Sequence, residues 1–126
     1  MRALHIVESA YRGTLEEQDD TILWLAHCVR AAGAELSVLL KDNAVNYILT
    51  GEDSSGLSFG GWRQTRPPQI AAQVAALIAN DVQVHAVAED VAQRGLIEAP
   101  RISGVRLVRR KELVSLFEAH DQLWHW

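Results

Sequence analysis

The sequence is poor in cysteine and contains no long run of apolar residues. Cys28 is the only cysteine among the 126 residues, so no disulfide can form within the chain. A single cysteine suits a reducing compartment, and we expect a cytoplasmic protein. No apolar segment approaches the roughly 20 residues that a membrane-spanning helix needs, and the run that begins at Ala3 is too short for a signal peptide. We therefore expect no association with membranes.

An excess of positive charge is also missing. The formal net charge is −4, which gives no general attraction for nucleic acid, and we expect none to be bound. Five basic residues cluster locally, and we interpret them as the solvated start of a helix: Arg101, Arg106, Arg109, Arg110 and Lys111. Apolar residues make up 48% of the chain, enough for the core of one domain that spans residues 1–126.

Short apolar segments alternate with helical patterns along the whole chain. The expected strands are 3–7, 35–40, 82–88, 105–108 and 121–126. The expected helices are 14–33, 44–49, 67–78, 89–94 and 109–119. This alternation predicts an α/β fold, a three-layer α/β/α sandwich with a mostly parallel sheet of about five strands. Ligands in such sheets bind beyond the carboxyl ends of the strands, here Glu8–Arg12, Lys41–Asn43 and Val87–Asp90.

Residues with capping preferences mark the expected helix starts. Thr14 with Glu17 forms a capping box, which places the acidic residues up to Asp20 in the first turns of the first helix. Asp42 or Asn43 is expected to cap the short helix 44–49. Pro67 and Pro68 open the third helix, and Gly33 closes the first. The glycine-rich segment 51–66 is predicted to be irregular, as in lids and partner-binding loops.

Four segments are informative when taken in order: VESAYRG (7–13), AAGAELSVLLKDNAVNYILTG (31–51), LIANDVQVHAVAEDVAQRGL (77–96) and GVRLVRRKELVSLFEAHDQLWHW (104–126). Together they resemble the DsrE/DsrF/DsrH family of sulfur-relay proteins, which also includes TusB, TusC and TusD. The resemblance covers essentially the whole chain. It implies a DsrE-like fold, a role in intracellular sulfur metabolism and an oligomer, either a homotrimer or homohexamer or a mixed assembly with other DsrE-like subunits or a TusA-like sulfur carrier.

The chain departs from this family at one position. The resemblance places the cysteine that accepts a persulfide sulfur at or near Val87, and no cysteine is present there. Only a thiolate can carry the sulfur, and Glu89 and Asp90 would raise the pKa of a thiol placed beside them. We therefore expect a non-catalytic subunit or docking partner. Cys28, in the middle of a helix, is expected to pack structurally, and transfer of the persulfide chemistry to this thiol is the less favoured alternative.

A second hypothesis is a pocket at the strand ends that binds a small anion or sulfur compound and performs acid–base chemistry. It requires His5 and His85, which interrupt apolar strands, to converge; burial in the core is the simpler interpretation. The pocket candidates are His5, Glu8, Ser9, Tyr11, Arg12, Asn43, His85, Val87 and Glu89. No spacing of metal ligands and no phosphate-binding loop motif is present, so we expect neither a metal nor a cofactor.

Tryptophan and arginine residues mark two candidate interfaces. Trp62 lies in the glycine-rich segment with Arg63 and Arg66, and aromatic–cation combinations are common at interface hot spots. Trp124 and Trp126 alternate along the last strand, and two exposed indole rings would be costly in water. We expect a subunit interface at one of these places, with packing inside the chain as the alternative.

Overall fold

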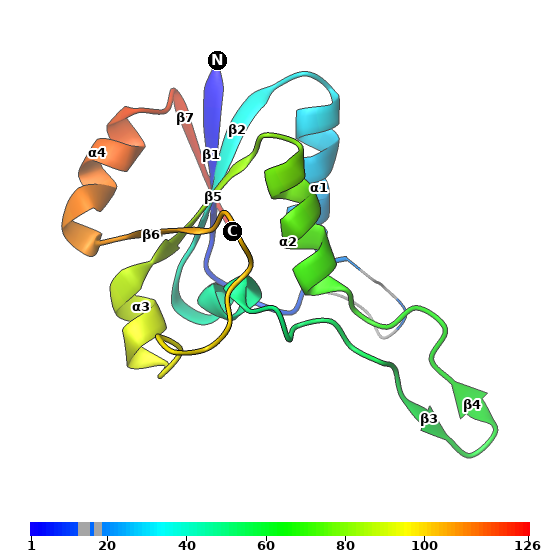
Figure 1. Cartoon of the computed structure of the whole chain (residues 1–126). Coiled ribbons are helices and arrows are strands. Elements are labelled where there is room, and N and C mark those ends of the chain that lie inside the picture. Colours follow the sequence, from blue (N-terminus) through cyan, green and yellow to red (C-terminus); the bar gives the residue numbers. More distant parts are fainter. Residues whose placement is uncertain (13–15, 17–18) are drawn as a thin grey trace.

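The computed structural model describes residues 1–12, 16 and 19–126 and contains a five-stranded sheet (Figure 1). Its strands are β1 (Arg2–Val7), β2 (Glu35–Leu40), β5 (Gln83–Val87), β6 (Arg106–Val108) and β7 (Gln122–His125). Their order is β6-β5-β2-β1-β7, and every neighbouring pair is parallel. The five strands predicted from the sequence are therefore confirmed, with ends that differ by at most one residue.

One face of the sheet is covered by α1 (Thr21–Ala31), α2 (Ile70–Ala79) and the 3₁₀-helix η1 (Asp42–Ile48) (Figure 1). Alternate strand residues, among them Val7, Val38 and Val84, join these helices in the larger core. Tyr47 is the largest fully buried side chain of this core. We call this the α1/α2 face.

The opposite face is covered by α4 (Leu113–Glu118), which follows the one-turn 3₁₀-helix η2 (Arg110–Glu112). Leu4, Leu39 and Val87 are buried here, and Leu116 and Phe117 of α4 pack on them. In Figure 1, α4 lies on the other side of the sheet from α1 and α2. A further helix, α3 (Ala88–Gln93), continues directly from β5. Helices on both faces confirm the three-layer α/β/α sandwich.

The first helix starts later than the sequence predicted. α1 begins at Thr21, and Asp20 is its N-cap, accepting hydrogen bonds from the amides of Ile22 and Leu23 at 2.9 and 3.1 Å. Asp20 therefore precedes the first turn instead of lying in it. The expected capping box of Thr14 and Glu17 lies outside the described residues. At the other end, Gly33 has a φ of 94° just after the helix, as expected for a C-terminal cap.

Two further helix starts differ from expectation. The 3₁₀-helix η1 begins at Asp42 and lacks a side-chain cap, so neither Asp42 nor Asn43 has the predicted capping role. Asp42 has a φ of 49° and directs its carboxylate toward Lys41. Pro67 and Pro68 lie before α2 (Ile70–Ala79) and do not open it. Gln69, between the prolines and the helix, has non-helical backbone angles, so α2 starts at Ile70. The sequence also predicts a buried stripe on this helix, formed by Ile70, Val74, Leu77 and Ile78. The first three are buried, and Ile78 is partly buried against the same core.

The glycine-rich segment contains a hairpin that the sequence did not predict. β3 (Ser58–Phe59) and β4 (Trp62–Arg63) pair antiparallel around Gly60 and Gly61, and Gly60 has a φ of 59°. A positive φ at the first residue of a two-residue loop is typical of a type II′ turn, which favours glycine. Figure 1 shows this hairpin projecting away from the sandwich. We call residues 57–64 the arm.

Candidate functional site

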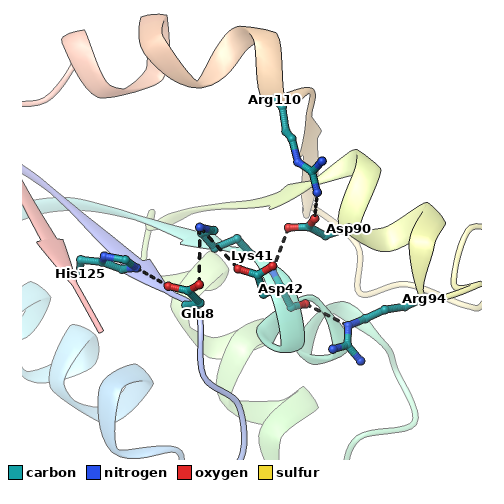
Figure 2. A network of polar contacts seen from close by, with 7 residues as sticks. All are labelled: Glu8, Lys41, Asp42, Asp90, Arg94, Arg110 and His125. Atoms are coloured by element: carbon teal, nitrogen blue, oxygen red, sulfur yellow. Dashed lines mark hydrogen bonds and ion pairs between the residues drawn. The ribbon is translucent and has the colours of Figure 1, made fainter.

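Charged side chains from several strand ends form one network at the carboxyl edge of the sheet (Figure 2). Glu8 follows β1, Lys41 and Asp42 follow β2, and Asp90 lies on α3 just after β5. Arg110 follows β6, and His125 is the last residue of β7. In a parallel sheet these ends lie at the same edge, which is where ligands bind in open α/β sheets. We call this group the edge network.

Glu8 is the centre of one half of the network. Its Oε2 lies 2.7 Å from Nε2 of His125, and its Oε1 lies 3.8 Å from Nζ of Lys41. Lys41 also lies 3.4 Å from Oδ2 of Asp42. A hydrogen bond with the Asp42 carboxyl, the bond with His125 and the charge of Lys41 lower the pKa of Glu8, so this carboxylate is ionised at neutral pH.

Asp90 is the centre of the other half, and its side chain is 4% exposed. Its Oδ2 accepts a hydrogen bond from the Asp42 amide at 2.8 Å, and its Oδ1 forms an ion pair with Arg110. The ion pair with Asp90 raises the pKa of Arg110. Arg94 donates to the Asp42 carbonyl at 3.2 Å, and Glu89 accepts from the Arg110 amide at 3.0 Å. Of the two acidic residues after β5, Asp90 is therefore matched by the Arg110 cation and Glu89 by the Arg110 amide.

Val87 ends β5 beside this network, and its side chain is buried at 1% exposure among Leu4, Ile6 and Leu39. The position implied for a sulfur-bearing cysteine is thus filled by an aliphatic group that packs in the core. Cys28 is exposed on α1, which corrects the expectation that it packs structurally. The edge network therefore has no thiol, and its acids and bases are engaged with one another.

The two histidines of the predicted pocket do not converge. In the sheet register, His5 pairs with Val38 and His85 pairs with Leu39. Successive residues of a strand point to opposite faces, so His5 lies on the α1/α2 face and His85 on the α4 face. His5 is fully buried, and its ring centroid lies 4.9 Å from that of Trp124. Burial lowers the pKa of both histidines. The hypothesis of a pocket that contains both histidines is therefore wrong.

A second polar cluster lies where the chain leaves β1 and enters α1. The Tyr47 hydroxyl donates to Oδ2 of the buried Asp20 at 2.7 Å and accepts a hydrogen bond from the Tyr11 amide. The Gln73 side chain accepts a hydrogen bond from the Asp20 amide at 3.0 Å and donates one to the Asp20 carbonyl at 3.3 Å. Burial and the bond to Asp20 raise the pKa of Tyr47. The polar groups of this cluster bond one another, so the cluster fixes the path of the chain from β1 to α1.

The other pocket candidates are distributed around these two clusters. Tyr11 turns its hydroxyl toward Glu52, at 2.6 Å, and Arg12 contributes backbone contacts to Asp20 and Thr21. Ser9 and Asn43 are exposed. Only Glu8 and Glu89 of the predicted side chains take part in the edge network. The sequence indicated its strand ends, but it missed Arg94, Arg110 and His125, whose only signal was their place next to strands or helices.

The interface candidates have different environments. Trp62 is partly buried, with its ring centroid 5.0 Å from that of Phe59, and both rings lie on the arm together with the exposed Arg63. Arg66 lies at the base of the arm, where its amide donates to Glu16 at 2.8 Å. Hydrogen bonds from the Arg66 amide and from the hydroxyl and amide of Thr65 lower the pKa of the Glu16 carboxyl. Trp126 packs against the core of the α1/α2 face, and Trp124 stacks on His5.

Among the described residues, no three His, Cys, Asp or Glu side chains are placed to hold a metal ion. No helix in the same part of the chain is long and apolar enough to cross a membrane.

No protein-family model matches the chain, and no curated protein matches its sequence. Among solved structures, the chain is similar to the YchN protein from E. coli, with a TM-score of 0.70 and 22% sequence identity over 100% of both chains. A likeness at this identity is evidence about the fold. The chain thus has the DsrE-like α/β/α sandwich, with its parallel five-stranded sheet, that its sequence predicted.

Proposed function

We propose that this protein is a non-catalytic DsrE-like subunit of a cytoplasmic sulfur relay, which docks with a cysteine-bearing DsrE-like subunit or a TusA-like carrier. The observation that supports the proposal is Val87. The position implied for the persulfide cysteine holds a buried aliphatic side chain next to a closed network of ion pairs. Sulfur transfer requires a thiolate that can reach its donor, and this edge offers none.

The edge network suits contact with a protein better than chemistry. Its carboxylates are paired with Lys41, Arg110 and His125, so no group is left as an unpaired acid or base. Paired charges at a rim give specificity and orientation to protein association without requiring a reaction. The proposed acid–base pocket has lost its geometric basis, because His5 and His85 lie on opposite faces of the sheet.

The arm is the second element that supports docking. Phe59 is 64% exposed, and Leu57 is also exposed on the same short hairpin. An isolated two-stranded hairpin buries little apolar surface, and exposed aromatic rings beside an arginine are common at interface centres. We propose that the arm contacts the carrier, with Phe59 and Trp62 as the apolar anchors and Arg63 as the cation.

Persulfide loading tests the non-catalytic role. The protein and its Cys28→Ser variant would be incubated with a cysteine desulfurase and cysteine, and bound sulfur would be measured by mass spectrometry. We expect no sulfur on the Cys28→Ser variant and no transfer from the wild-type protein to a carrier. Because Cys28 is exposed, sulfur bound to Cys28 alone would not contradict the proposal. Passage of that sulfur from Cys28 to a carrier would contradict it.

Carrier binding tests the docking role and the arm. The dissociation constant for a TusA-like or cysteine-bearing DsrE-like protein from the same organism would be measured by calorimetry. We expect Phe59→Ser to weaken binding about tenfold or more, the usual loss for an anchor residue. Val114→Ser is the matched control, because Val114 is 63% exposed on α4, as Phe59 is 64% exposed on the arm. Equal affinities for both variants would remove the arm from the interface, and no binding to any such carrier would contradict the docking role.

A further inference from the structure

The two outer strands of the sheet differ in how they are protected from pairing with another chain. β6 is three residues long and is surrounded by cations, since it begins at Arg106 and is followed by Arg109 and Arg110. Charged residues on a short edge strand are the usual protection against association. β7 is the opposite edge and carries the side chains of Gln122, Leu123, Trp124 and His125. The only ionisable group among them, His125, is engaged with Glu8.

The backbone of β7 presents unpaired groups at this edge. Trp126 donates to the Ile6 carbonyl at 2.9 Å and accepts from the Glu8 amide at 3.0 Å, so both of its backbone groups face β1. Backbone groups alternate in direction along a strand, so the amide and carbonyl of Trp124, which pairs with His5, also face β1. The amides and carbonyls of Leu123 and His125 therefore point away from β1. In the described part of the chain, no strand pairs with β7 on that side.

The side chains at this edge are apolar where a protected edge would be charged. Leu123 is 47% exposed on the α4 face, and Trp124 is only partly covered on the α1/α2 face. A row of free backbone groups with apolar side chains on both faces is a template for strand addition. An edge that remained free in the assembled protein would be expected to carry charges, as β6 does.

We propose that β7 pairs antiparallel with β7 of a second copy of this chain across a twofold axis, joining the two sheets into one continuous sheet. This inference deepens the assembly role of the proposed function by naming one surface and its partner. A twofold axis through Leu123 places Leu123 against its own copy and Asp121 opposite His125 of the partner subunit. Asp121, whose carboxylate accepts a hydrogen bond from the Arg2 amide, thus faces His125, the one ionisable group of β7, which contacts Glu8 in its own chain.

The solution mass of the chain alone, measured by light scattering over a range of concentrations, tests the pairing. We expect a mass that is an even multiple of the chain mass and that Leu123→Lys halves. Leu107→Lys is the matched control, because Leu107 is 42% exposed on β6, as Leu123 is 47% exposed on β7. We expect this control to keep the wild-type mass. A wild-type monomer, or equal masses for both variants, would overturn the inference.

Backbone pairing is separated from side-chain contact by Leu123→Pro and by hydrogen exchange. Proline at this position removes an amide that points outward and leaves the bonds of Trp124 and Trp126 to β1 in place, so the fold should survive. We expect the dimer to be lost in this variant, and the amides of Leu123 and His125 to exchange at least tenfold more slowly in the wild type than in Leu123→Lys. Fast exchange of both amides in a wild-type dimer would overturn the pairing. Carrier binding retained by monomeric Leu123→Lys would show that the two proposals stand separately.

Discussion

Asp20 joins three segments of the chain through one buried side chain. Its Oδ1 caps α1, and its Oδ2 accepts hydrogen bonds from the Tyr47 hydroxyl at 2.7 Å and from the Arg12 amide at 3.3 Å. A carboxylate that is only 1% exposed must have its charge satisfied by such donors, or it would cost several kcal/mol to bury. The start of α1 is therefore fixed by tertiary contacts as much as by its own sequence.

The Tyr47→Phe substitution tests this arrangement. It removes the hydroxyl that donates to Asp20 and accepts from the Tyr11 amide. The buried Asp20 carboxylate and the half-buried Tyr11 amide then each lose one hydrogen-bond partner. We expect the free energy of unfolding to fall by about 1–3 kcal/mol, as is typical when a bond to a buried charged group is lost. Urea denaturation at neutral pH measures this change.

Tyr11→Phe is the control for that experiment. The Tyr11 hydroxyl binds Glu52 at the surface, and the Tyr11 contact with Tyr47 uses its backbone amide, which the substitution keeps. A change of less than about 0.5 kcal/mol is expected for such a surface group. Equal losses for Tyr47→Phe and Tyr11→Phe would contradict the role assigned to Asp20.

At the scale of elements, the arm projects from the sandwich and is attached to it at its base (Figure 1). Its base is held by hydrogen bonds from Thr65 and Arg66 to the carboxylate of Glu16 and by a bond from the Ser54 amide to the Pro68 carbonyl. Within the arm, the Gln64 amide donates to the Leu57 carbonyl at 2.8 Å. These contacts fix where the arm leaves the sandwich, and among the strands of the described residues β3 and β4 beyond them pair only with each other.

Replacing Ser58–Arg63 by Asn-Gly tests whether the arm matters for stability. Leu57 and Gln64 already face each other as a hydrogen-bonded pair, which a two-residue Asn-Gly turn can join. We expect thermal unfolding to show a loss of less than about 1 kcal/mol, because the deleted residues bury little apolar surface. A loss of several kcal/mol would mean that the arm packs on the sandwich, which would argue against its role in binding a carrier.

The sequence predicted the elements of the sandwich well and the arm poorly, for a physical reason. Five apolar segments of strand length reveal the sheet, but β3 and β4 have two residues each, too few to show a period. The sequence placed the start of the first helix at Thr14, because a capping box there was the visible signal, whereas the N-cap of α1 is Asp20, six residues later. The contacts of Asp20 with Tyr47 and Gln73 identify the N-cap, and they join residues that are far apart in the sequence.

At the scale of the whole molecule, the sequence indicated where a site would lie but not which side chains would meet there. The carboxyl ends of β1, β2 and β5 were expected to contribute, and Glu8, Lys41 and Asp90 do so. Arg110 and His125 depend on the strand order, because β6 and β7 come from the end of the chain and lie at opposite edges of the sheet. The register between β1, β2 and β5 places His5 and His85 on opposite faces of the sheet. Alternation within each strand alone cannot reveal this, because it does not relate one strand to the next.

The two buried histidines give the stability of the whole molecule a dependence on pH. Burial lowers the pKa of His5 and of His85 below 6.5, and within the described residues neither nitrogen of His5 has a hydrogen-bond partner. Well above pH 6.5 both rings are neutral in the folded and unfolded states and have no effect. As the pH falls below 6.5, the unfolded chain binds these protons first, so the free energy of unfolding must decrease.

The slope of unfolding free energy against pH between 6.5 and 5 therefore reports on these rings, before the carboxylates with lowered pKa, such as Glu16, lose their charge. Each unit by which a pKa is lowered corresponds to about 1.4 kcal/mol at the acid limit. We expect His5→Phe, which keeps an aromatic ring against Trp124, to flatten this slope whatever its effect at pH 7.5. Parallel curves for the wild type and His5→Phe would contradict the argument, because they would mean that His5 takes up its proton as easily in the folded protein as in the unfolded chain.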